Sequence, residues 1–330
     1  MRKLLLIGGT GIIGKAAIRE AYARGGYEVT TISLEYEESY PDTVVQVIAD
    51  RRDRGGFQKA MVSLLNQEWD IVFDIFSFDG LDAEQTYTLF GKIAKHIVTI
   101  STALVYDRSK PTSQLITEEH SLSPRGTLGG YVDHKLELEH FWLQAGDVNW
   151  TILRPYHIIG ANTLIGCLPL HNRDPNIVKR VKEGGVLELC NSGNVDLTFI
   201  NPRDIAKAFF AVAGNPTTYG KAYNLVHPEI ISAKNYYELL GELLGKEVVI
   251  KPKPIKEIWD EGLGWELTTL PHRYSAEALK NDTGYVASVS LRESLTEALV
   301  DYPPIEGELE EIPIHQRMNI LPKPKLVNLI

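Results

Sequence analysis

Apolar and polar positions alternate in blocks through the first half of the chain. Short apolar, β-rich runs predict strands at residues 3–7, 28–33, 44–48, 70–76, 96–101 and 150–153. Between them, apolar residues at helical spacing predict helices over 14–24, 57–66, 82–94 and 131–145. Strands that alternate with helices build right-handed βαβ units. We therefore expect an α/β fold with a doubly wound parallel sheet that is covered on both faces.

The pattern loosens after about residue 160. Two helical stretches and three short strands are predicted there, at 174–183, 233–244, 186–189, 197–200 and 222–226. This division indicates a first domain over 1–160 and a smaller C-terminal lobe over 161–330, with some later segments returning to the first domain. Residues 303–330 contain Pro and Glu and are weakly periodic, which predicts a tail that either wraps a neighbour or stays loose.

The composition is that of a globular protein, with 44% hydrophobic and 23% charged residues. A net charge of −9 argues against nucleic acid as the main partner, because proteins that bind a phosphate backbone present a basic face. Cys167 and Cys190 are too few for a disulfide framework and lack metal-ligand spacing. No signal peptide or apolar run of membrane-spanning length is evident. We expect a cytoplasmic protein with free thiols, no metal and no membrane contact.

A glycine-rich turn follows the first predicted strand and precedes the first predicted helix. Gly8 permits a tight turn, Gly11 lets the backbone approach a phosphate, and Gly14 lets the helix pack close to the strand. The helix N-terminus then directs its N–H groups and positive dipole end at an anion. This arrangement predicts a Rossmann domain that binds a dinucleotide pyrophosphate. The alternative is a glycine-rich turn without a ligand.

Tyr131 and Lys135 lie four residues apart on a predicted helix, on the same face. A Tyr hydroxyl has an unperturbed pKa of about 10, and a nearby positive charge brings it into range for proton transfer. The Lys135 ammonium and an oxidised nicotinamide ring would both favour the phenolate. Ser101 and Thr102 end a predicted central strand, where a hydroxyl can hydrogen-bond a substrate oxygen. Together these residues predict hydride transfer with Tyr131 as general acid/base, whereas the pair alone would suit an ordinary helix surface.

The chain resembles an extended short-chain dehydrogenase/reductase of the NAD-dependent epimerase/dehydratase group over about residues 1–300. The resemblance rests on Gly8-x-x-Gly11-x-x-Gly14, the segment from Ser101 to Tyr106, Tyr131-x-x-x-Lys135, Leu153-Arg154-Pro155 with Ile158-Ile159-Gly160, and the segment from Phe199 to Ala206. It implies that Thr102 is the catalytic hydroxyl, that Tyr131 is the general acid/base and that Lys135 lowers the pKa of Tyr131. It also implies a homodimer formed by helices 82–94 and 131–145.

The resemblance further implies which residues contact the ligands. Cofactor contacts are expected from Gly8, Thr10, Gly11, Ile12, Ile13, Gly14, Ser33, Asp50, Arg51, Phe76, Ser101, Tyr131, Lys135, Pro155, His157 and Ile158. Contacts with a small-molecule substrate are expected from Ala103, Tyr156, His157 and Arg273.

The cofactor is predicted to be NAD, with NADP still open. Ser33 stands where an acidic residue normally binds the adenosine ribose, and neither Arg nor Lys follows it directly. However, Arg51, Arg52 and Arg54 follow the third predicted strand and could reach a 2′-phosphate. The other interpretation of these arginines is a solvated charge cluster.

The chain also departs from the family pattern. Ala103 and Leu104 stand where dehydratases of the group carry an Asp-Glu pair, so a 4,6-dehydratase is disfavoured. Leu197 stands in a stretch that often supplies an Arg to a nucleotide diphosphate, so a sugar-like or polyol-like metabolite is predicted without a required nucleotide. Epimerase and reductase/dehydrogenase remain alternatives.

Residues 49–53 and 74–79 are closer to atypical members that include chloroplast RNA-associated proteins, which motivates a second hypothesis: a dinucleotide-binding redox regulator or RNA-associated protein without turnover.

Overall fold

The computed structural model describes residues 1–107, 114–126, 130–166, 174, 176–260 and 270–302. Its centre is a seven-stranded sheet in which every neighbouring pair is parallel. The strands lie in the order β3 (Val45–Ile48), β2 (Tyr27–Ser33), β1 (Arg2–Ile7), β4 (Ile71–Asp74), β5 (Ile97–Ile100), β6 (Trp150–Pro155) and β9 (Lys221–Leu225). The expected doubly wound α/β fold is therefore confirmed. The strand order reverses between β1 and β4, which is where open α/β sheets bind ligands.

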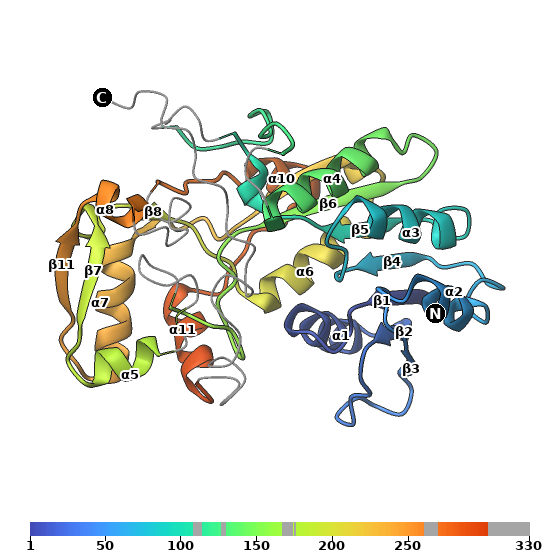
Figure 1. Cartoon of the computed structure of the whole chain (residues 1–330). Helices are drawn as coiled ribbons and strands as arrows, with labels where there is room; N and C mark the ends of the chain where they lie inside the picture. Colours follow the sequence, from blue (N-terminus) through green and yellow to red (C-terminus); the bar gives the residue numbers. More distant parts are fainter. Residues whose placement is uncertain (108–113, 127–129, 167–173, 175, 261–269, 303–330) are drawn as a thin grey trace.

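Helices cover both faces of this sheet, as Figure 1 shows. One face carries α1 (Ile12–Arg24), α6 (Pro202–Val212) and α10 (Glu277–Thr283), and the other carries α2 (Arg54–Met61), α3 (Gly80–Phe90) and α4 (Gly130–Gln144). Alternate residues of β1 pack against the helices on opposite faces of the sheet, because successive side chains of a strand point to opposite faces. Leu4 and Leu6 pack in the α1–α6 layer, whereas Leu5 and Ile7 pack in the layer of α2, α3 and α4.

The second lobe has its own hydrophobic core. It contains α5 (Ile177–Lys182), α7 (Ala233–Leu244), α8 (Ile255–Asp260), α11 (Leu291–Leu299), β7 (Val186–Cys190), β8 (Asp196–Leu197), β10 (Ile231–Ser232) and β11 (Val249–Lys253). β7 pairs in parallel with β11, and β8 pairs antiparallel to β10. This lobe lies beside the main sheet on the left of Figure 1.

The segment that follows the second lobe's first strands returns to the main sheet. α6 packs against α1, and β9 pairs with β6 at the sheet edge. The strand at 222–226 is predicted from the sequence, whereas the helix at 202–212 is not. The helix begins with a clear signal, since the Asn201 side chain accepts a hydrogen bond from the Arg203 N–H at 2.8 Å and Pro202 occupies the first turn.

Other boundaries differ modestly from those predicted. β4 is shorter than the predicted strand at 70–76, and β8 overlaps the strand predicted at 197–200 only at Leu197. β11, α8, α10 and α11 were not predicted. The predicted tail at 303–330 and Cys167 lie outside the described residues.

Candidate functional site

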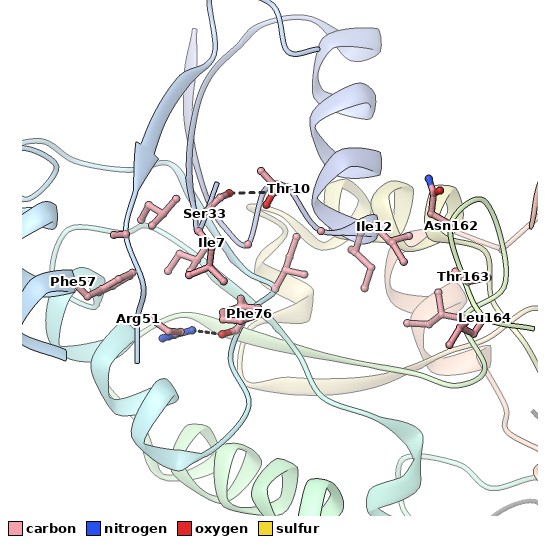
Figure 2. A pocket seen from close by; sticks show the side chains of 18 residues that line it. Ile7, Thr10, Ile12, Ser33, Arg51, Phe57, Phe76, Asn162, Thr163 and Leu164 are labelled. Atoms are coloured by element: carbon pink, nitrogen blue, oxygen red, sulfur yellow. Dashed lines mark hydrogen bonds between the residues drawn. The ribbon is translucent and has the colours of Figure 1, made fainter. Parts of the chain in front are cut away.

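A cavity of about 560 Å³ opens at the carboxyl ends of β1, β2 and β4 (Figure 2). Its lining is largely apolar, with a few polar groups from the glycine turn, β2 and the loop after β6. The lining residues are Ile7, Gly8, Thr10, Gly11, Ile12, Ile13, Ile32, Ser33, Leu34, Ala49, Arg51, Phe57, Ile75, Phe76, Ile158, Asn162, Thr163 and Leu164. A site of this size, concave and mostly apolar, is typical of small-molecule and cofactor binding.

The glycine turn forms one side of the cavity. Gly8 has a φ of +98°, which disfavours any residue with a Cβ. A Cβ on Gly14 would overlap the carbonyl oxygens of Gly8 and Gly9, so helix α1 contacts the turn at this point. No side chain caps the N-terminus of α1 at Gly11, and the end of the 13-residue helix faces the cavity (Figure 2). The turn thus presents backbone N–H groups and the positive helix end to an anion.

Ser33 ends β2 beside this turn and is buried. Its Oγ accepts a hydrogen bond from the Thr10 N–H at 3.1 Å, drawn as a dashed line in Figure 2. The hydroxyl therefore holds the turn and lines the cavity at the same time. An acidic side chain at this position could accept the same bond but would add a charge next to the phosphate-binding turn.

Arg51 is buried, with its side chain 1% exposed, and it lies at the cavity edge. Its five N–H donors all have partners: Nη1 donates to Asp74 Oδ1 and the Phe76 carbonyl, Nη2 to the Asp82 carbonyl and Thr86 Oγ1, and Nε to Gln85 Oε1. The solvated-cluster interpretation is therefore wrong for Arg51. The sequence does not show this burial, because the partners of the guanidinium lie 23 to 35 positions away along the chain.

The rest of the predicted arginine group is exposed. The Arg52 side chain is 73% exposed and pairs with Asp50, whose carboxylate also accepts the Arg52 N–H at 2.9 Å. Arg54, at the start of α2, pairs with Asp82 at 3.0 Å. These contacts fix the loop after β3 and place Asp50 outside the cavity lining.

Lys135 lies on α4 and is 2% exposed. Its ammonium donates to the carbonyls of Ser77 at 2.5 Å and Ile100 at 2.9 Å, at the carboxyl ends of β4 and β5. It lies 5.8 Å from the centre of the Tyr131 ring, one turn earlier on the same helix. Burial lowers the pKa of Lys135 to about 8, and the charge of Asp74 opposes this shift. The ammonium is thus held close to Tyr131 in a place with little solvent.

Two serines with buried hydroxyls lie in the segments that supply these carbonyls. Ser77 supplies one of the carbonyls that bind Lys135, and Ser101 follows Ile100, which supplies the other. The Oγ atoms of Ser77 and Ser101 are both buried without a hydrogen-bond partner among the described residues. Thr102 is also buried, and its Oγ1 accepts the Leu104 N–H at 3.3 Å, which starts a short 3₁₀ turn through Ala103.

Strand β6 leads into the predicted substrate contacts. Pro155 ends the strand, and His157 two residues later has a φ of +43°, which is unusual for a residue with a Cβ. The ring of Tyr156 stacks on His272 with centroids 4.4 Å apart, and His272 Nδ1 lies 3.0 Å from the Tyr274 hydroxyl. Arg273 pairs with Asp196 at 3.5 Å. These rings form an aromatic cluster beyond the end of β6. The predicted substrate residues Ala103, Tyr156, His157 and Arg273 do not line the cavity.

A buried polar network supports β6 behind that cluster. Arg154 donates to both carboxylate oxygens of Glu139 on α4, at 2.9 and 2.5 Å. Its Nη1 donates to the hydroxyl of Tyr106 at 2.7 Å, and that hydroxyl donates to Asn224 Oδ1 on β9 at 2.7 Å. These contacts join four separate segments of the first domain. The motif positions of Arg154 and Tyr106 do not predict this network, because its partners are distant in sequence.

The structure brings only part of the predicted cofactor set together around the cavity. The predicted residues that line it are Gly8, Thr10, Gly11, Ile12, Ile13, Ser33, Arg51, Phe76 and Ile158. The predicted residues outside its lining are Gly14, Asp50, Ser101, Tyr131, Lys135, Pro155 and His157. The lining residues that were not predicted are Ile7, Ile32, Leu34, Ala49, Phe57, Ile75, Asn162, Thr163 and Leu164. Most of these are apolar residues at strand ends or in loops, which motif spacing does not reveal.

Other chemistry is limited in the part of the chain that the structure describes. No group of three or more His, Cys, Asp or Glu side chains within it is arranged to hold a metal ion. No helix among those residues combines the length and the apolarity needed to cross a membrane. Cys190 is a buried free cysteine, and its burial raises the pKa of the thiol.

Comparison with known proteins agrees with this architecture. Residues 85–225 match the model of the NAD dependent epimerase/dehydratase family. An epimerase from Methanothermobacter thermautotrophicus superposes with a TM-score of 0.70 at 18% identity, over 90% of each chain. The UDP-glucose 4-epimerase from Bifidobacterium longum, in complex with NAD+ and UDP, superposes with a TM-score of 0.65 at 19% identity, over 90% of this chain and 97% of that one.

A curated relative is the chloroplast stem-loop binding protein of 41 kDa b from Arabidopsis thaliana, at 26% identity over 235 residues. The match covers 68% of this chain and spans 58% of the length of that relative. The solved structures show that the fold is shared, and the family match covers the segment that carries Tyr131 and Lys135. Residues 85–225, set in this fold, are therefore similar to the NAD dependent epimerase/dehydratase family.

Proposed function

We propose that the chain is an NAD-dependent oxidoreductase or epimerase that acts at a carbinol or carbonyl carbon of a sugar-like or polyol-like metabolite. The observation that carries the proposal is the buried Lys135 ammonium, bound to the Ser77 and Ile100 carbonyls and close to Tyr131. These groups lie at the carboxyl ends of β4 and β5, and β4 is the sheet neighbour of β1, the strand that leads into the glycine turn.

A dinucleotide suits the residues of the cavity. The uncapped end of α1 and the turn at Gly8–Gly11 would hold its diphosphate, and the apolar side chains of Ile32, Ala49 and Phe57 would accept an adenine ring. When bound, the nicotinamide would supply hydride transfer. The buried Ser77 and Ser101 hydroxyls, which lack partners among the described residues, indicate that a polar group or water belongs beside these hydroxyls.

The cavity favours NAD over NADP. A 2′-phosphate needs hydrogen-bond donors near the end of β2, and all five N–H groups of Arg51 already donate to other protein groups. Ser33 is a small neutral residue at the place where the adenosine ribose would lie. We expect the Kd for NADH, measured by titration calorimetry, to be lower than that for NADPH.

Three side chains would carry the proton chemistry. The Lys135 ammonium would stabilise the Tyr131 phenolate by charge, so that Tyr131 could take a proton from a substrate hydroxyl or return one to a carbonyl oxygen. The Thr102 hydroxyl would hydrogen-bond the same substrate oxygen. Ala103 and Leu104 offer no carboxylate for an elimination, so a 4,6-dehydratase reaction remains disfavoured.

The test is turnover of candidate ketosugars and polyols with NADH or NAD+, followed by nicotinamide absorbance and by product analysis for epimers. Tyr131→Phe should abolish turnover and leave the Kd for NADH near the wild-type value. Unchanged turnover in this variant would overturn the mechanism. Mass spectrometry of the purified protein would separate the two reaction types, since a retained oxidised cofactor favours an epimerase and an empty site favours cofactor exchange.

The stem-loop binding relative supports a second candidate function, an RNA-associated or regulatory dinucleotide-binding protein without turnover. The acidic net charge of −9 opposes it, and so does the presence of both Tyr131 and Lys135. Salt-sensitive binding of an RNA stem-loop at near-physiological ionic strength, together with no turnover of any tested metabolite, would favour this candidate.

A further inference from the structure

The turn that contacts the proposed diphosphate is held by two side chains from outside it. The Tyr40 hydroxyl donates a hydrogen bond to the Gly9 carbonyl at 2.6 Å. At the other end of the same peptide unit, the Thr10 N–H donates to Ser33 Oγ at 3.1 Å (Figure 2). Both polar groups of the Gly9–Thr10 peptide are therefore bound by side chains, and rotating this peptide would break two hydrogen bonds.

Gly9 is also enclosed by strand β2. A Cβ at this position would lie 2.7 Å from the Cβ of Thr31, closer than real side chains approach. The Thr31 hydroxyl itself donates to the Leu6 carbonyl at 3.2 Å, which fixes it on the sheet. The turn is thus held on one side by β2 and on the other by Tyr40.

The loop that carries Tyr40 is anchored to helix α1 and strand β3. Glu37 pairs with Lys15 in the first turn of α1. The Glu37 N–H donates to Gln46 Oε1 at 2.8 Å, and Gln46 Nε2 donates to the Glu37 carbonyl at 3.0 Å. Burial and the nearby Glu37 charge raise the pKa of Tyr40 to about 12, so its hydroxyl keeps the proton that it donates.

We propose that Tyr40 is a positioning residue for the diphosphate, an inference that rests on the dinucleotide site proposed above. Its hydroxyl holds the Gly9 carbonyl away from the anion site and so keeps the N–H groups at the start of α1 directed at the phosphates. Without that bond the Gly9–Thr10 peptide can rotate and place a carbonyl dipole near the phosphates, where its negative end is repelled.

The experiment compares Tyr40→Phe with Tyr22→Phe in the full chain. Tyr22 is a matched control because its hydroxyl also bonds the same loop, at Thr43, but does not contact the turn. Titration calorimetry gives the Kd of each protein for NADH, ADP and adenosine. Tyr40→Phe should raise the Kd for NADH and ADP about three- to tenfold, the effect of one lost hydrogen bond, and leave the Kd for adenosine unchanged. Tyr22→Phe should change none of the three.

Hydrogen exchange provides a second measurement. The Thr10 amide should exchange faster in Tyr40→Phe than in Tyr22→Phe, because only the first substitution releases its peptide unit. An equal rise in the Kd for ADP and adenosine in Tyr40→Phe would overturn the role of Tyr40 without affecting the proposed dinucleotide site. Equal changes in Kd and in amide exchange in the two variants would do the same. Failure of the wild-type protein to bind NADH and ADP would overturn both proposals.

Discussion

Replacing Glu139 by Gln tests how strongly the buried ion pair holds helix α4 to strand β6. The Glu139 and Arg154 side chains are 0% and 5% exposed, and the guanidinium donates to both carboxylate oxygens. Arginine stays protonated in proteins, so the substitution leaves its charge buried without a counterion. The folded state then carries an uncompensated charge that the unfolded state exposes to water.

The expected loss follows from the contacts that remain. Breaking a buried ion pair by removing one partner costs about 3–5 kcal/mol of unfolding free energy. Gln retains one carbonyl oxygen for Arg154, and the Tyr106 hydroxyl still accepts its third bond. We therefore expect a cost near the lower end of that range, about 3 kcal/mol.

Urea denaturation followed by circular dichroism measures this cost. The midpoint should fall by the cost divided by the slope m, with m unchanged. Glu242→Gln is the matched control, because Arg292 also donates to both of its oxygens, at 3.0 and 2.8 Å, but both side chains are more than half exposed. The control should leave the midpoint unchanged. Equal midpoints for the two variants would refute the reasoning.

Further predictions concern pH, the glycine turn and assembly. The pKa of Lys135 is lowered to about 8, so turnover should fall as the pH rises through 8, because the ammonium that favours the Tyr131 phenolate is lost. A turnover rate that stays constant up to pH 10 would contradict this role. Burial lowers the pKa of His96 from 6.5 to about 3. The neutral imidazole should therefore contribute stability above pH 6.5 that is lost as the pH falls toward 3. The urea midpoint should depend less on pH in His96→Gln than in the control His140→Gln, at an exposed position. Gly14→Ala should weaken NADH binding at least tenfold in calorimetry, since a Cβ there overlaps the turn carbonyls. Light scattering should give the mass of a homodimer, and a monomer at all concentrations would exclude it.

The fold could be predicted because its signals are local. Each central strand is a short apolar run, and each of the predicted helices of the first domain shows apolar residues at helical spacing. The helix at 202–212 also has a local signal, because Asn201 caps it and Pro202 lies in its first turn, although the segment Phe199–Ala206 also resembles a family motif.

The residues that tune the site were harder to predict because their partners are distant. Arg51, at the end of β3, binds Asp74, at the end of β4, although β2 and β1 lie between these strands in the sheet. Sequence shows only that Arg51 is a cation, and whether it faces solvent, a phosphate or a carboxylate depends on which strand ends meet. The same holds for Tyr40, whose partner Gly9 lies 31 positions away. The glycine spacing therefore predicts a ligand class from local backbone chemistry, whereas selection between NAD and NADP depends on contacts that only the assembled sheet creates.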